Sequence, residues 1–68
     1  MKFSYDKEAD AAYVYFVDSI GDGEAVETIE LNDNIVLDFN KDGKLLGMEI
    51  LSAEKVLGEK VLSANSIA

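Results

Sequence analysis

The sequence predicts an α+β domain that is mostly β, an antiparallel meander of about five strands followed by a short C-terminal helix. Apolar and polar residues alternate with the period of two that is typical of half-buried strands. Asn, Asp and Gly residues separate the strand candidates, and short turns between consecutive strands make a meander the simplest topology. A helix signal comes after the last strand candidate.

The first two strands are predicted on either side of a polar turn. Residues 2–6 alternate between polar and aromatic side chains, which predicts a short strand, and residues 6–10 predict the turn. Residues 11–18 are rich in β-branched and aromatic residues and predict a second strand. Both of its faces are apolar, with Ala12, Val14 and Phe16 on one and Tyr13, Tyr15 and Val17 on the other.

Three further strands are predicted after a loop that contains two glycines. Residues 25–31 resume the alternation, and Asn-Asp-Asn at residues 32–34 predicts a tight turn into a strand over residues 35–39. Asn-Lys-Asp-Gly at residues 40–43 predicts a type I turn whose glycine takes the left-handed position of a bulge. This turn closes a hairpin onto a strand over residues 44–51.

The C-terminal helix is predicted to begin at Ala53, with Ser52 as its N-cap. Gly58 interrupts the helical pattern, and the sequence leaves helix, strand and frayed tail open for residues 59–68. We therefore expect a single β-rich domain over residues 1–57 and a C-terminal extension over residues 58–68.

The composition limits both the stability and the partners of the chain. A chain of 68 residues without Cys has a small core and no disulfide or thiolate metal site, so we expect self-association as a homodimer. The net charge of −8, with six Lys as the only cations, disfavours direct nucleic-acid binding. Solubility is the most common role of such a charge, and a basic protein or a hard cation is the kind of partner that it would attract. The charged N-terminal residues and the lack of a long apolar run indicate a cytoplasmic protein outside the membrane.

Catalytic and cofactor sites have little support in the sequence. The chain has no His and no Cys, which removes the common general base and the most reactive nucleophile, so we expect no enzyme and no cofactor. Asp38-x-Asn40-x-Asp42-Gly43 with Glu49 satisfies the formal pattern of an EF-hand calcium loop, but strand residues flank it where an EF-hand needs helices. The hairpin interpretation is therefore preferred.

One cluster of carboxylates is a weak candidate for a metal site. Asp6, Glu8 and Asp10 occupy alternate positions and could ligate a divalent cation if the segment were extended. A solvated turn is the more common role of such a cluster. Lys7 lies in its middle and offsets part of the negative charge.

Three spaced motifs resemble those of a small prokaryotic family of unknown function, numbered 2283. They are Tyr5-Asp6-x-Glu8-Ala9-Asp10-Ala11-x-Tyr13, Asp33-Asn34-x-Val36-Leu37-Asp38 and Asp42-Gly43-x-Leu45-x-Gly47-x-Glu49-Ile50-Leu51. The resemblance covers about residues 1–55 and implies a compact β-rich domain. It brings no activity, cofactor or catalytic residue. Some similar proteins are encoded beside small toxin-like proteins, which implies an antitoxin-like role for them.

The sequence thus favours a non-enzymatic protein-interaction or regulatory module, an antitoxin-like neutraliser of a small basic partner being one form of it. A divalent-cation (calcium or magnesium) binder is the alternative. Two apolar strand faces need cover, so a homodimer is expected either face to face or through strand edges. For the second strand, the C-terminal helix is an alternative cover. The candidate interface residues are Tyr13, Tyr15, Val17, Leu45 and Leu51.

Overall fold

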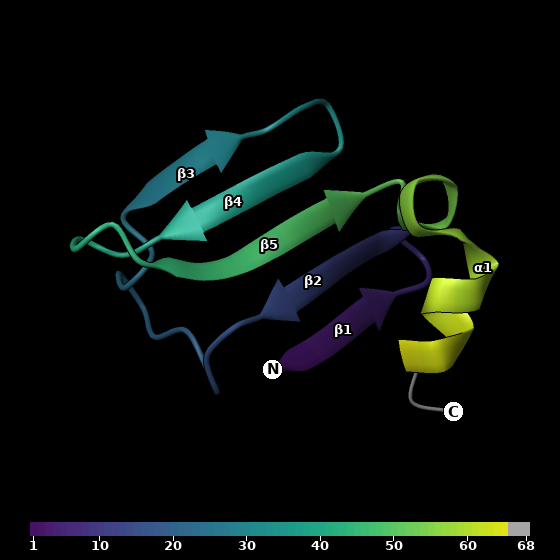
Figure 1. The fold of residues 1–68 in the computed structure, drawn as a ribbon, viewed down its shortest axis with the longest axis horizontal. Coiled ribbons are helices and arrows are strands. Elements are labelled where there is room, and N and C mark those ends of the chain that lie inside the picture. The colour runs from purple at the N-terminus through teal and green to yellow at the C-terminus, as the bar shows by residue number, and fades with distance from the viewer. Residues whose placement is uncertain (66–68) are drawn as a thin grey trace.

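A computed structural model describes residues 1–65 as one antiparallel sheet with a single helix (Figure 1). The elements are β1 (Lys2–Asp6), β2 (Ala11–Tyr15), β3 (Glu27–Glu30), β4 (Ile35–Phe39), β5 (Leu45–Leu51) and α1 (Ala53–Asn65). The predicted fold class, a five-stranded antiparallel sheet with a short C-terminal helix, is confirmed.

The strands are arranged in the order β1-β2-β5-β4-β3. The sheet therefore joins a β1–β2 hairpin to a β3–β4–β5 meander, and β5 lies beside β2 where a strictly sequential order would place β3 (Figure 1). The order agrees with the chemistry of the strands. The apolar strands β2 and β5 are central, whereas β3, with sequence Glu-Thr-Ile-Glu, lies at an edge where charged side chains reach water.

Two strands are shorter than predicted. Strand β2 ends at Tyr15 although the predicted strand continued to residue 18, and β3 covers four residues of the predicted 25–31. Single backbone hydrogen bonds continue the ladder beyond both strands, as when the Phe16 amide donates to the Leu46 carbonyl at 2.9 Å. Residues beyond these bonds have strand-like composition but no neighbouring strand to pair with. The alternation of apolar and polar residues therefore overstated the length of β2 and β3.

The two predicted turns of the meander are confirmed. The side chain of Asn32 accepts hydrogen bonds from the amides of Asn34 and Ile35, at 2.8 and 2.9 Å. The side chain of Asn40 likewise accepts from the amides of Asp42 and Lys44, and Gly43 takes the expected left-handed conformation with φ of 76°. Both Asn side chains thus close their own turns, as Asx residues commonly do.

Helix α1 packs over β1, β2 and β5 on one face of the sheet. Its buried residues Ala53 and Leu62 join Ala12 and Ile50 in the core. Gly58, with φ of 84°, kinks the helix between its two halves. The chain is therefore helical through Asn65, and Leu62 of the predicted extension belongs to the core. The remaining part of that extension, residues 66–68, lies outside the described residues.

Candidate functional site

The face of the sheet that carries α1 is covered over only part of its width. Register pairs Ile29 of β3 with Leu37 of β4, and Leu37 with Met48 of β5, so all three side chains lie on this face. Met48 packs against the core beneath α1, whereas Ile29 is 44% exposed. We call the uncovered part the open face. It comprises Ile29, Leu37, Phe39 and Leu45.

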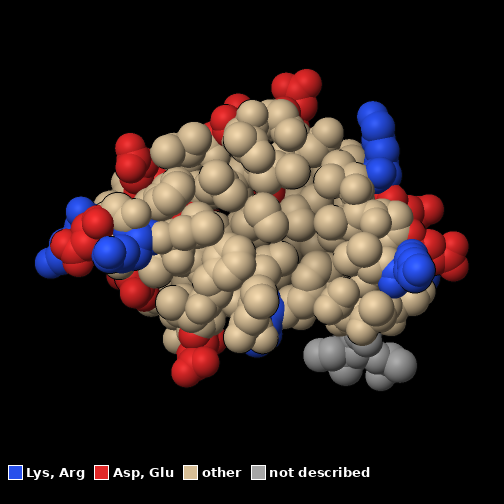
Figure 2. Space-filling model, in the orientation of Figure 1, with Lys and Arg blue, Asp and Glu red and all other residues tan. Residues whose placement is uncertain are grey.

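Carboxylates border the open face on the side of β3. Residues 18–33 contain six Asp or Glu and no Lys or Arg, and every residue from 21 to 33 is exposed. Figure 2 shows a broad face whose middle is largely free of charged side chains, with both acidic groups and Lys side chains projecting around its rim. Val26 and Leu31, at the two ends of β3, are 60% and 63% exposed. An apolar surface of this kind with a negative rim suits a partner that is both apolar and basic.

The opposite face of the sheet carries a polar network that spans four strands. The Tyr13 hydroxyl on β2 donates to Asp38 Oδ2 on β4 at 2.6 Å, and the Thr28 hydroxyl on β3 donates to Asp38 Oδ1 at 2.9 Å. Burial and the bond to Asp38 raise the pKa of Tyr13. Tyr15 packs against Tyr13, with ring centroids 4.6 Å apart, and the Lys2 ammonium lies 4.6 Å from the Tyr15 ring centroid.

Gly47 on β5 makes this network possible. A Cβ atom at position 47 would lie 2.4 Å from the Tyr13 hydroxyl and 2.5 Å from its ring, so a side chain there would displace the tyrosine. The absence of a side chain lets Tyr13 cross β5 and reach Asp38. A glycine inside a strand pattern often marks such a close approach, so Gly47 could have drawn attention to this strand, but it did not indicate which side chain crosses there.

Asp10 connects the β1–β2 turn to the start of α1. Its Oδ1 accepts hydrogen bonds from the Tyr5 hydroxyl at 2.8 Å and from the Glu54 amide at 3.0 Å, while its carbonyl accepts from the Ala53 amide. The bond to Asp10 raises the pKa of Tyr5. The prediction that the side chain of Ser52 caps the helix is wrong, because the Val56 amide donates to the Ser52 carbonyl. The capping side chain is that of Asp10, which is far away in the sequence.

Two of the three carboxylates considered as metal ligands have structural partners. Asp6 Oδ1 accepts from the amides of Glu8 and Ala9, and Asp10 caps the helix. Within residues 1–65 no group of three or more Asp, Glu, His or Cys side chains is placed to hold a metal ion. The EF-hand pattern lies in the β4–β5 hairpin, with Asp38 and Glu49 on separate strands.

The five candidate interface residues do not all lie together on the surface. Tyr13 and Tyr15 lie on the face opposite α1, so the helix does not cover them and the alternative that made them helix-covered core is wrong. Leu45 and Leu51 are 40% and 38% exposed, whereas Leu46 and Ile50 are buried. Val17 comes after β2 and is half-buried. Their contact with a second chain stays a prediction.

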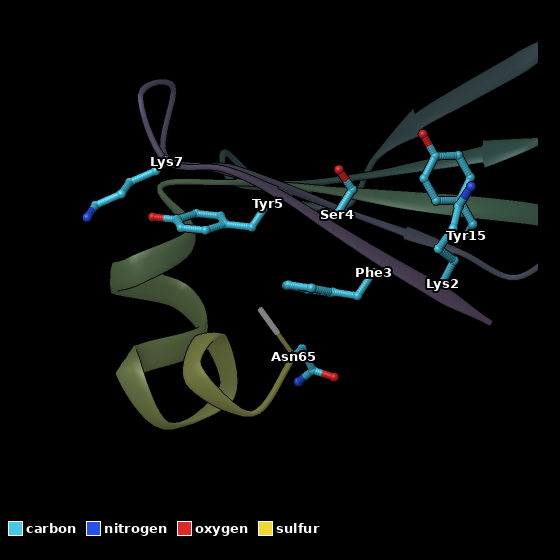
Figure 3. Close-up of a pocket in the computed structure, with 7 residues that line it drawn as sticks. All are labelled: Lys2, Phe3, Ser4, Tyr5, Lys7, Tyr15 and Asn65. Atoms are coloured by element: carbon cyan, nitrogen blue, oxygen red, sulfur yellow. The ribbon is translucent and has the colours of Figure 1, made fainter. Parts of the chain in front are cut away.

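A groove of about 530 Å³ runs along the outer edge of β1 (Figure 3). Four consecutive residues, 2–5, line it together with Lys7, Tyr15 and Asn65. Phe3 and Tyr5 point toward α1 in Figure 3, and Ser4 points to the other side of the sheet. The groove therefore borders the open backbone edge. No pattern in the sequence marked β1 as an edge strand.

Comparison with known proteins gives a family and no activity. The model of a family described as "Protein of unknown function (DUF2283)" matches residues 2–54, which include all five strands and the start of α1. No curated protein and no solved structure matches the chain. Among residues 1–65, no helix is long and apolar enough to cross a membrane.

Proposed function

We propose that this chain, which belongs to the DUF2283 family, is a non-enzymatic protein-interaction module that binds a basic partner through the open face. The observation that carries the proposal is the coincidence of the exposed Ile29 on β3 and half-buried apolar side chains on β4 with the carboxylates of residues 18–33. Folded chains rarely leave contiguous apolar surface uncovered without a use for it.

Charge defines the class of the partner. The segment of residues 18–33, in which residues 21–33 are all exposed, holds six of the fourteen carboxylates of the chain and none of its six Lys, so the negative charge is concentrated beside the open face. Such a field attracts a Lys- or Arg-rich protein, speeds its association and disfavours acidic competitors. Apolar side chains of the partner then exclude water from Ile29 and Leu37. A regulatory or neutralising role toward a small basic protein is the function that this chemistry supports.

The experiment compares three baits in lysate of the source cells, read by mass spectrometry. The wild-type chain and Thr28→Ser, which alters the opposite face of the same strand, should both enrich one basic protein. Ile29→Ser, which removes an apolar contact without changing charge, should lose it. Raised salt should also weaken capture, because screening acts on exposed charges. An empty capture, an acidic binder, or equal capture by all three baits would overturn the proposal.

A further inference from the structure

The two edges of the sheet differ in their chemistry. In the order β1-β2-β5-β4-β3, only β1 and β3 lie at edges, so each has backbone groups that face away from the sheet. Strand β1 has the sequence Lys-Phe-Ser-Tyr-Asp and β3 has Glu-Thr-Ile-Glu. The β1 edge is bordered by the open groove of Figure 3, to whose lining Asn65 of α1 also contributes.

We propose that β1 pairs with β1 of a second copy of this chain, antiparallel and with a two-fold axis at Ser4. This register places Lys2 opposite Asp6 of the second copy and Phe3 opposite Tyr5 of the second copy. The symmetry repeats both pairs, so the strand is complementary to itself in charge and in shape. Opposite charges and aromatic pairs are the cross-strand combinations that stabilise antiparallel sheets.

The positions of these side chains fit the proposed pairing. Phe3 and Tyr5 lie on the α1 side, where both pack against the core, so the two aromatic pairs form beside the helices. A groove of about 650 Å³ lined by Phe3, Val14, Leu57 and Val61, among others, borders this position and gives the aromatic pairs an apolar wall. Lys2 and Asp6 alternate with them and form their ion pairs on the other face.

The other edge excludes the same arrangement. Strand β3 has two Glu and no Lys or Arg, so no antiparallel β3–β3 register can place opposite charges across the strand pair, and the four Glu of two copies come together without a cation. The acidic edge therefore stays unpaired when the β1 edge is used. The assembly closes as a two-fold dimer with one ten-stranded sheet, and it does not extend into a fibre.

The test uses charge reversal and mixing, read by sedimentation equilibrium. The wild-type chain should reach twice its 7.4 kDa monomer mass as concentration rises. Lys2→Asp places two acids opposite each other and Asp6→Lys places two cations opposite each other, so each variant alone should dimerise at least about tenfold more weakly. An equimolar mixture of the two should regain the dimer, because every charged pair is again opposite in sign.

Either substitution could weaken dimerisation by loosening the β1–β2 turn. Mixing the two variants would not restore the dimer in that case, because a chain that has unfolded is not refolded by the other variant. Recovery of the dimer in the mixture therefore points to charge pairing. Ile29→Ser, on the open face, should dimerise as the wild type does. A wild-type chain that stays at the monomer mass up to millimolar concentration overturns the proposal. Dimers of either single variant as strong as wild type, or a mixture no stronger than its components, also overturn it.

Discussion

The two halves of the helix-bearing sheet face have similar residues and different surroundings. Under α1, Ile50 of β5 is 1% exposed and packs with Ala12, Ala53 and Leu62. Two strands away, Ile29 of β3 is 44% exposed although its side chain lies on the same face. The first half has the properties of a core, and the second has an exposed apolar side chain on the surface that we propose as a binding site.

Under the proposed function, this difference separates stability from recognition within a small domain. The free energy from burial comes mainly from the covered half, because burial removes apolar area from water there. The open half contributes less to folding and keeps its apolar area available for a partner. Substitutions in the two halves should therefore affect different measurements.

The largest expected effect is the loss of a buried side chain. Ile50→Ala should lower the free energy of unfolding by about 2–5 kcal/mol, because it leaves a cavity in a small core. Ile29→Ala removes the same atoms from the open face and should lower it by less than about 1 kcal/mol. Urea unfolding followed by circular dichroism measures both values. Equal losses would show that the open half is also core.

A second prediction concerns the link between the two halves across the opposite face. Gly47→Ala should lower the free energy of unfolding by about 1–3 kcal/mol, because the new methyl group occupies the position of the Tyr13 ring and breaks its bond to Asp38. In a Tyr13→Ser background the same substitution should lose most of its effect, since the ring is gone. An effect that persists in this background would assign the loss to the backbone of β5.

The third prediction tests how α1 is held on the covered half. Asp10→Ala removes the acceptor of both the Glu54 amide and the Tyr5 hydroxyl and should lower the free energy of unfolding by about 1–2 kcal/mol. Ser52→Ala should lower it by less than about 0.5 kcal/mol, because Ser52 contributes its carbonyl. Thermal unfolding of the two variants measures both losses. A larger loss for Ser52→Ala than for Asp10→Ala would show that Ser52 is the capping side chain.

Local chemistry explains how far the sequence predicts this fold. The turn closed by Asn32 and the turn closed by Asn40, with Gly43 in its left-handed position, depend on residues within a few positions, and both agree with the structure. Alternation located every strand, and it overstated β2 and β3 because strand propensity continues past the last paired residue.

Contacts between distant residues were beyond the sequence. Neither the pairing of β2 with β5 nor the cap that Asp10 provides for Glu54, 44 residues away, can be read from local pattern. The face chosen by α1 was equally open, because β2 is apolar on both sides. Only the structure shows that Tyr13 and Tyr15 lie away from the helix, and that Thr28, Asp38 and Tyr13 meet over Gly47.

The smallest expected effect is a pH dependence of stability from Tyr13. Burial and the bond to Asp38 raise the pKa of Tyr13 in the folded chain above its ordinary value of 10.0. The folded state then keeps a proton that the unfolded state releases. The stabilisation is therefore fully present below pH 10 and is lost as the pH rises above it.

The contribution of Tyr13 to the free energy of unfolding should accordingly be constant between about pH 7 and 9 and should fall above about pH 10. Tyr13→Phe removes the titrating group, so its curve should fall less steeply in the alkaline range although its stability at neutral pH is lower. Tyr15→Phe is the matched control, because Tyr15 lies on the same strand and face without the bond to Asp38. Parallel alkaline slopes for wild type and Tyr13→Phe would show that the hydroxyl of Tyr13 ionises alike in the folded and unfolded chains, and that the link from β2 to β4 is not held by this proton.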